Sequence, residues 1–141
     1  MRTPLALLSI AAIAAGLTAC GGPDVFDIEV GSCMNKTDLE GDEVSAIKTF
    51  DCAEEHDVEA YAATDLEGDE YPGKDAILTK AEDFCMAEFE SFVGSNYQES
   101  TLFFSYLYPT QESWDQKDDR QVLCLLISDE PVTGSLGGSG L

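Results

Sequence analysis

A chain of 141 residues with 28 acidic and 7 basic side chains has a formal net charge of −21 at pH 7. Nucleic acids and anionic lipid headgroups would both be repelled by such a surface, so the charge argues against either as a partner. It fits instead a solvated acidic exterior, a cationic partner or loosely held divalent ions. The length suits one domain with one core.

The first 19 residues are typical of a bacterial signal peptide. Arg2 provides a positive charge, and the uncharged apolar run at residues 5–17 is shorter than the roughly 20 residues that cross a bilayer. Residues 17–20 read Leu-Thr-Ala-Cys and match the lipobox, in which a bulky apolar residue precedes two small residues and a cysteine. We therefore expect a lipoprotein that is cut before Cys20 and anchored by acyl chains such as palmitate on that cysteine. Secretion without a lipid is the alternative.

Cys20 and a very short tether, residues 20–24, precede the expected domain at residues 25–132. At ~3.6 Å per residue, the four residues after Cys20 reach about 14 Å. We therefore expect the domain to lie close to the extracytoplasmic face of the cell membrane. A partner would then be a membrane-proximal protein.

Three strands are expected in the first half of the domain. Apolar and polar side chains partly alternate over residues 25–33 and 44–52, and they alternate most regularly over residues 56–64. Short turns join the three segments. This order predicts an antiparallel meander.

A long helix is expected next. Apolar side chains fall at helical spacing over residues 74–93, which follow Pro72 and Gly73, and Gly94 is a natural end for the helix. The stripe consists of Ile77, Ala81, Phe84, Cys85, Phe89 and Phe92. Such a stripe is more typical of a helix face in the core than of a ligand-binding wall.

Two strands and a short helix complete the predicted domain. Residues 101–108 alternate in polarity and predict a strand. Thr110 is suited to cap a short helix that contains Trp114, and the apolar run at residues 121–128 suits a central strand. Residues 133–141 are rich in glycine and serine and predict a flexible tail. The fold class is therefore α+β, with one long packed helix and one short helix on a mostly antiparallel sheet.

Four cysteines remain when the lipidated one is set aside, and an even number in an exported chain predicts two disulfides with three possible pairings. We favour Cys33–Cys52, because both residues end early strands. We favour Cys85–Cys124, because that bridge joins the helix stripe to the apolar strand. A zinc site is disfavoured and no metal or cofactor is expected, since there is no Cys-x-x-Cys pair and His56 is the single histidine.

An acidic hexapeptide, Asp-Leu-Glu-Gly-Asp-Glu, occurs at residues 38–43 and again at residues 65–70. A calcium-binding loop is one interpretation. The glycine stands fourth, however, whereas the EF-hand loop places it sixth and ends on a glutamate that both repeats lack. Two exposed loop tips are the plainer interpretation.

No catalytic residue is assigned from the sequence. His56 and Asp57 are neighbours, but adjacent strand residues point to opposite faces, so a structural histidine is the better interpretation. No nucleophile motif is present. A cell-wall hydrolase with paired carboxylates has no motif to exclude it, although most of the acidic residues cluster in turns, where a raised pKa is hard to achieve.

Aromatic side chains mark a possible binding surface, since exposed aromatics are typical interface anchors. The candidates are Tyr71, Tyr106, Tyr108 and Trp114. The alternative, that these side chains fill the core, is at least as well supported.

The chain resembles the septum-formation family of small actinobacterial lipoproteins over residues 30–136. The matching pieces are Val30-Gly31-Ser32-Cys33, Cys52, His56-Asp57-Val58-Glu59, Tyr71-Pro72-Gly73, the helix with Cys85, residues 108–114, Val122-Leu123-Cys124 and Gly134-Ser135-Leu136. Glu55 departs from the pattern, which more often has proline before the histidine.

This resemblance implies a role in septum formation or cell-envelope assembly, and it supplies no catalytic or ligand-binding residues. We expect a non-enzymatic, partner-binding envelope lipoprotein. A carboxylate-based hydrolase and a weak calcium-binding module are the alternatives.

Overall fold

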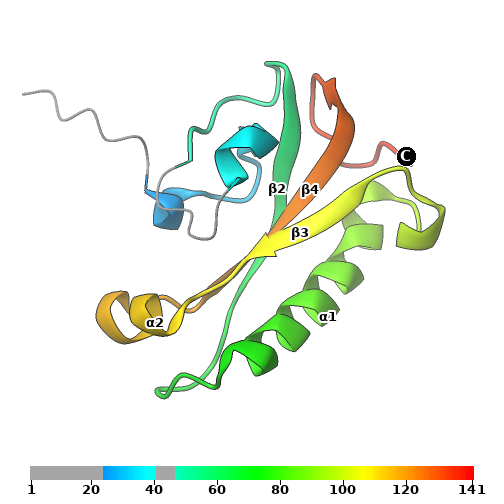
Figure 1. Ribbon diagram of the computed structural model, residues 1–141. Helices are drawn as coiled ribbons and strands as arrows, with labels where there is room; N and C mark the ends of the chain where they lie inside the picture. Colours follow the sequence, from blue (N-terminus) through cyan, green and yellow to red (C-terminus); the bar gives the residue numbers. More distant parts are fainter. Residues whose placement is uncertain (1–23, 41–46) are drawn as a thin grey trace, which may run out of the picture.

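A four-stranded antiparallel sheet, in the strand order β1-β2-β4-β3, organises the chain (Figure 1). The computed structural model describes residues 24–40 and 47–141. The strands are β1 (Cys33–Met34), β2 (His56–Asp65), β3 (Phe103–Leu107) and β4 (Gln121–Val132). The helices are α1 (Lys74–Val93) and α2 (Gln111–Lys117), with 3-10 turns η1 (Val25–Asp27), η2 (Lys36–Leu39) and η3 (Tyr97–Glu99). Within the described ranges, no helix has the length and hydropathy needed to span a bilayer.

Strand β4 lies at the centre of the sheet, as its apolar run predicts, and pairs with both β2 and β3. Its side chains from Val122 to Leu126 are buried on both faces. Cys124 and Leu126 belong to the hydrophobic cluster beside α1, whereas Leu123 and Leu125 belong to the cluster on the opposite face. A strand covered on both faces has no polar alternation, and this explains the continuous apolar run.

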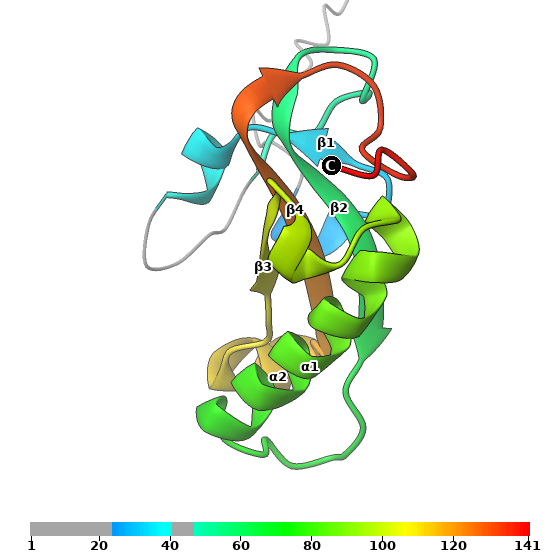
Figure 2. The same ribbon diagram turned by 90° about the vertical axis from the view of Figure 1, so that its right-hand side faces the viewer.

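Helix α1 covers one face of the sheet (Figure 2). Ile77, Cys85 and Phe89 of the predicted stripe are fully buried. Gly94 ends the helix with a φ of +83°, a left-handed conformation that glycine adopts without steric cost, and its amide donates to the Glu90 carbonyl at 2.9 Å. The Tyr61 hydroxyl of β2 donates to the Cys85 carbonyl at 2.6 Å and ties the helix to the sheet.

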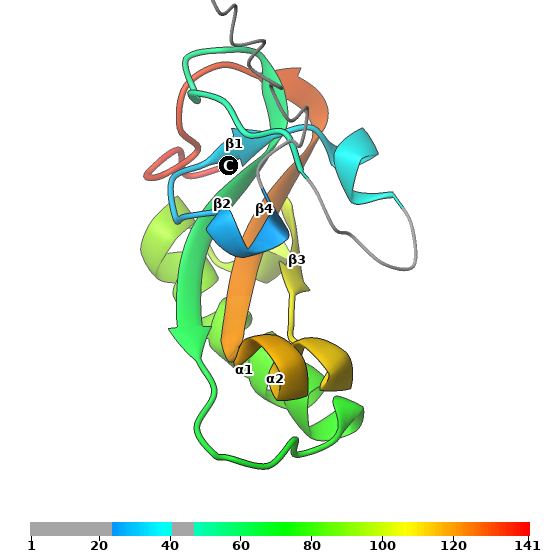
Figure 3. The same ribbon diagram turned by 90° about the vertical axis from the view of Figure 1, so that its left-hand side faces the viewer.

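The N-terminal segment covers the other face (Figure 3), and here the first predicted strand is wrong. Val25–Asp27 forms η1 instead of a strand, and Gly31 turns the chain at a φ of +93°. Ile28 is 2% exposed, while Phe26 and Val30 are 42% and 51% exposed. Between residues 24 and 32, Ile28 is thus the single fully buried side chain, and the segment does not present an alternating strand face.

The second predicted strand, residues 44–52, is also not found as a strand. Residues 41–46 lie outside the described ranges, and the remainder contributes only an isolated bridge between Phe50 and Cys33. The predicted three-strand meander is therefore wrong, because the only strand paired with β2 in that part of the described chain is the two-residue β1. The predicted third strand, helix α1, the next strand, the short helix and the last strand are all present, so the α+β class is confirmed.

Both predicted disulfides are present. Cys33 and Cys52 are bridged with their Cα atoms 5.1 Å apart, and Cys85 and Cys124 with theirs 5.5 Å apart. The second bridge joins α1 to β4 inside the core, where both of its cysteines are fully buried.

The C-terminal residues 133–141, predicted as a flexible tail, are packed against the domain. Leu136 is 4% exposed and belongs to the cluster beside α1. Its amide and the Ser135 hydroxyl each donate to the Glu59 carboxylate at 2.7 Å, and the Gly138 amide donates to the Phe92 carbonyl at 2.7 Å. Composition alone misses this packing because one apolar side chain and several backbone amides provide the contacts.

Candidate binding edge at strand β3

Strand β3 forms one edge of the sheet. Among the described residues it pairs with β4 on one side and with no strand on the other. An unpaired strand edge presents backbone N–H and C=O groups to which another extended chain can hydrogen-bond. The strand ends at Leu107 and leads through Tyr108 and Pro109 to the capping residue Thr110 of α2.

A first hollow of about 570 Å³ lies between β3, α2 and the segment around η1. Its apolar lining includes Leu107, Leu123 and Leu125. Four charged residues also line it, three acidic and one basic, namely Asp24, Glu112, Asp119 and Lys117. Lys117 stands over the Phe26 ring at 4.5 Å from the ring centroid.

A second hollow, of about 510 Å³, lies between β3 and α1. Leu78, Met86 and Phe104 provide apolar surface, and Glu82 is the charged residue of the lining. The charge balance of both hollows is therefore negative.

Ser105, Tyr106 and Tyr108 line both hollows, so the two hollows meet along β3. The Tyr106 and Tyr108 rings are 6.1 Å apart at 61°, and both side chains are half-buried. Burial, then the negative charge of Glu82 and then Tyr108 raise the pKa of Tyr106 above the ordinary tyrosine value of 10.0. The Tyr106 hydroxyl therefore stays protonated at neutral pH and is available to donate a hydrogen bond.

Trp114, one of the four aromatic candidates, is not part of this surface. It is 1% exposed, its Nε1 donates to the Asp69 carbonyl at 3.1 Å, and the Arg120 guanidinium stacks 3.8 Å from its ring centroid. Tyr71 packs edge-on against the Trp114 ring at 5.8 Å and lines neither hollow. Two of the four predicted aromatics, Tyr106 and Tyr108, thus lie together at the candidate site.

His56 and Asp57 do not form a catalytic pair. His56 is 1% exposed, and its Nδ1 donates to the Glu54 carbonyl at 2.8 Å. Asp57 instead accepts a hydrogen bond from the Lys36 amide at 2.6 Å and lies 3.8 Å from the Lys36 ammonium. The buried carboxylate of Glu59 is occupied by Ser135 and Leu136, and it lies away from both hollows.

The acidic hexapeptides fall in unequal positions. Only residues 38–40 of the first repeat lie within the described ranges, at the end of η2. The second repeat runs from the last residue of β2 into the loop before α1, and all of its residues except Leu66 are exposed. This exposure agrees with the interpretation of the second repeat as a loop.

Comparison with known proteins gives one assignment. The family model described as septum formation matches residues 28–137, which include β3, both helices and all four disulfide cysteines. The searches of curated proteins and of solved structures gave no match.

Proposed function

The chain belongs to the septum-formation family, and from this we propose that it is a non-enzymatic envelope lipoprotein that binds an extended, basic segment of a partner protein. Family membership supports a role related to septum formation. The partner, the lipid anchor and the position at the cell membrane are our inferences.

The observation that carries the proposal is the pair of hollows that meet along β3, at the edge where no other strand of the described part of the chain pairs with it. Side chains of an added strand point alternately to the two faces of the sheet. A segment paired to β3 would therefore direct successive side chains alternately toward the hollow beside α2 and the hollow beside α1. Ser105, Tyr106 and Tyr108, which line both hollows, would contact the bound segment on both faces of the sheet. This is the general arrangement by which edge strands recognise peptides.

The charge of the two hollows indicates which kind of partner segment they would bind. Glu82 lines one hollow, and Asp24, Glu112 and Asp119 outnumber Lys117 in the other. The formal net charge of −21 adds a long-range field that attracts cations. Lysine and arginine side chains, whose long apolar stems suit the leucine and tyrosine linings, match both properties.

The anchor would place this edge near the membrane. Asp24, four residues after Cys20, lines the first hollow. A lipid on Cys20 would thus hold that hollow within about 14 Å of the membrane surface. A partner would reach the hollow with a juxtamembrane or loop segment.

We expect the full chain to bind an extended peptide with lysine at successive positions, and not a peptide of the same length with glutamate at those positions. Glu82→Lys should weaken this binding about tenfold, because it removes one attraction and adds one repulsion. The matched control is Glu90→Lys, which makes the same charge change at an exposed position of α1 outside both hollows. Fluorescence anisotropy of the labelled peptide measures both affinities.

Backbone methylation of the peptide tests strand addition itself. One set of alternate N–H groups would bond to β3 and the other set would point away. Methylating the first set should abolish binding, and methylating the second should preserve it. Equal binding by the two methylated peptides, or equal effects of Glu82→Lys and Glu90→Lys, would contradict the proposed site.

A further inference from the structure

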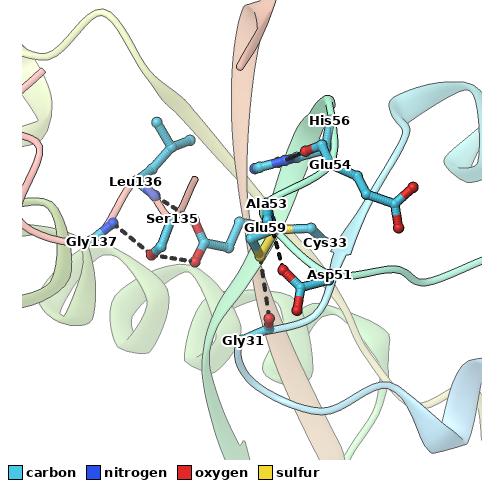
Figure 4. The surroundings of a disulfide bond; sticks show 11 residues. Gly31, Cys33, Asp51, Ala53, Glu54, His56, Glu59, Ser135, Leu136 and Gly137 are labelled. Atoms are coloured by element: carbon cyan, nitrogen blue, oxygen red, sulfur yellow. Dashed lines mark hydrogen bonds between the residues drawn. A yellow bond between two sulfur atoms is a disulfide. The ribbon is translucent and has the colours of Figure 1, made fainter. Parts of the chain in front are cut away.

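Four potential metal-ligating side chains converge beside β1, far from the β3 edge. Each of Cys33, Cys52, His56 and Glu59 offers one ligand atom, and all four atoms lie within 4.8 Å of one another. Cys33 is the cross-strand partner of Glu59 in the β1–β2 pair, which places their side chains on the same face. Figure 4 shows the Glu59 carboxylate and the His56 imidazole near the disulfide of Cys33.

The His56 ring has one nitrogen without a hydrogen-bond partner among the described residues. Because the Glu54 carbonyl can only accept, Nδ1 carries the proton and Nε2 holds a free lone pair. Nε2 is buried, and no residue within 24–40 or 47–141 hydrogen-bonds to it. An imidazole fixed through Nδ1 to a backbone carbonyl, with a bare Nε2, is the usual state of a metal-bound histidine.

Glu59 is held in a similar way. Ser135 Oγ donates to Oε1 and the Leu136 amide donates to Oε2, both at 2.7 Å (Figure 4). These bonds orient the carboxylate and leave each oxygen a second lone pair. Such outer contacts are typical of carboxylates that ligate metals.

We propose that reduction of the Cys33–Cys52 disulfide converts this cluster into a Zn²⁺ site with two sulfur, one nitrogen and one oxygen ligand. A dithiol reductant breaks the S–S bond and is itself oxidised to a disulfide, leaving two thiols on the chain. Zinc binding then releases the two thiol protons to solvent. Four ligands of these types suit tetrahedral zinc, with bonds of about 2.0–2.3 Å.

The two disulfides differ in their access to a reductant. Cys52 is half-buried, whereas Cys85 and Cys124 are fully buried. Thiol–disulfide exchange needs access to a sulfur atom, so the first bridge is reduced first and the second continues to join α1 to β4. Sequence spacing could not reveal the site, because three ligands come from the β1–β2 region and the fourth is Cys52 in the intervening turn.

The test compares zinc binding by the oxidised chain with binding by the full chain after treatment with a dithiol and its anaerobic removal. Zn²⁺ alone is titrated against a chromogenic chelator, and Co²⁺ serves as a spectroscopic probe. We expect one zinc per reduced chain, thiolate-to-cobalt charge-transfer bands, and no binding by the oxidised chain.

Two variants separate a ligand from a neighbouring polar residue. His56→Gln should weaken zinc binding by more than about 100-fold, beyond the 10–100-fold typical of losing an outer contact. Asp57→Asn, on the next residue but held by Lys36, should leave zinc affinity unchanged.

Circular dichroism in the near ultraviolet monitors the fold of the reduced chain. If reduction loosens the fold, zinc should restore the native spectrum. Absence of zinc binding by the reduced chain, failure of zinc to restore a lost fold, equal binding by the oxidised chain, or unchanged affinity in His56→Gln would each overturn the proposal.

Discussion

The double variant Cys85→Ala/Cys124→Ala is expected to lose about 4 kcal/mol of unfolding free energy. The two cysteines are 39 residues apart, and their bridge restricts the unfolded chain by closing a long loop. Both sulfurs also fill fully buried space between α1 and β4, so their removal reduces packing as well. Urea denaturation followed by far-ultraviolet circular dichroism measures the loss.

The matched control is Cys33→Ala/Cys52→Ala, whose bridge spans 19 residues at the edge of the sheet. The shorter loop gives an expected loss of about 3 kcal/mol, with little added packing cost because Cys52 is half-buried. A larger loss in the control than in Cys85→Ala/Cys124→Ala would contradict the assignment of the α1–β4 bridge as the main covalent support of the core.

Trp114→Ala is expected to cost about 3–5 kcal/mol, the range for deleting a large aromatic side chain from a core. Trp114 is 1% exposed and contacts two surrounding segments, the loop before α1 and the residue before β4. It donates to the Asp69 carbonyl before α1, stacks on Arg120 before β4, and contacts Tyr71. Its loss would leave a cavity between α2 and the start of β4. Chemical denaturation measures the change.

Trp114→Phe is the control for this prediction. It keeps an aromatic ring but removes the Nε1 hydrogen bond, so most of the stability should remain. If Trp114→Ala were as stable as the parent chain, the residue would be a surface aromatic, as the sequence analysis allowed, and the core position would be contradicted.

The predictable parts of the fold are those where one side-chain period runs long enough to be unambiguous. The apolar stripe recurs along the 20-residue helix α1, and β2 alternates within 10 residues, so tertiary contacts reinforce the local pattern. Strand β4 has no such period and was predicted from its continuous apolar run instead. The segment at residues 25–33 has too few positions to distinguish a strand from a turn that inserts Ile28 into the core. The conformation of that segment is determined by tertiary packing of Ile28 and not by its local pattern.

The candidate site was only partly predictable for a related reason. Tyr106 and Tyr108 are two residues apart on an alternating segment, so their common side follows from strand geometry. Glu82 is separated from them by more than twenty residues and joins them only because α1 packs beside β3. The exposed polar face of a helix contains no sequence signal that specifies which of its charges lies next to a strand edge.

Residues 133–141 illustrate the limit of composition. Their glycines and serines are typical of linkers, yet Leu136 enters the core and the neighbouring amides bond to Glu59 and to α1. The buried Glu59 carboxylate provides the acceptor for this segment. A buried acid in a strand thus indicates that hydrogen-bond donors pack against it, and here a donor lies 77 residues further along the chain.

The most direct test of the central claim is localisation in dividing cells of the chain fused at its C-terminus to a fluorophore that matures outside the cytoplasm. The parent chain, Cys20→Ala, Glu82→Lys and Glu90→Lys are compared at equal expression. The account predicts septal enrichment for the parent and Glu90→Lys, loss of membrane retention for Cys20→Ala, and even membrane distribution for Glu82→Lys. Septal enrichment of Glu82→Lys equal to that of the parent would contradict binding at the β3 edge, and even distribution of the parent would contradict action at the septum.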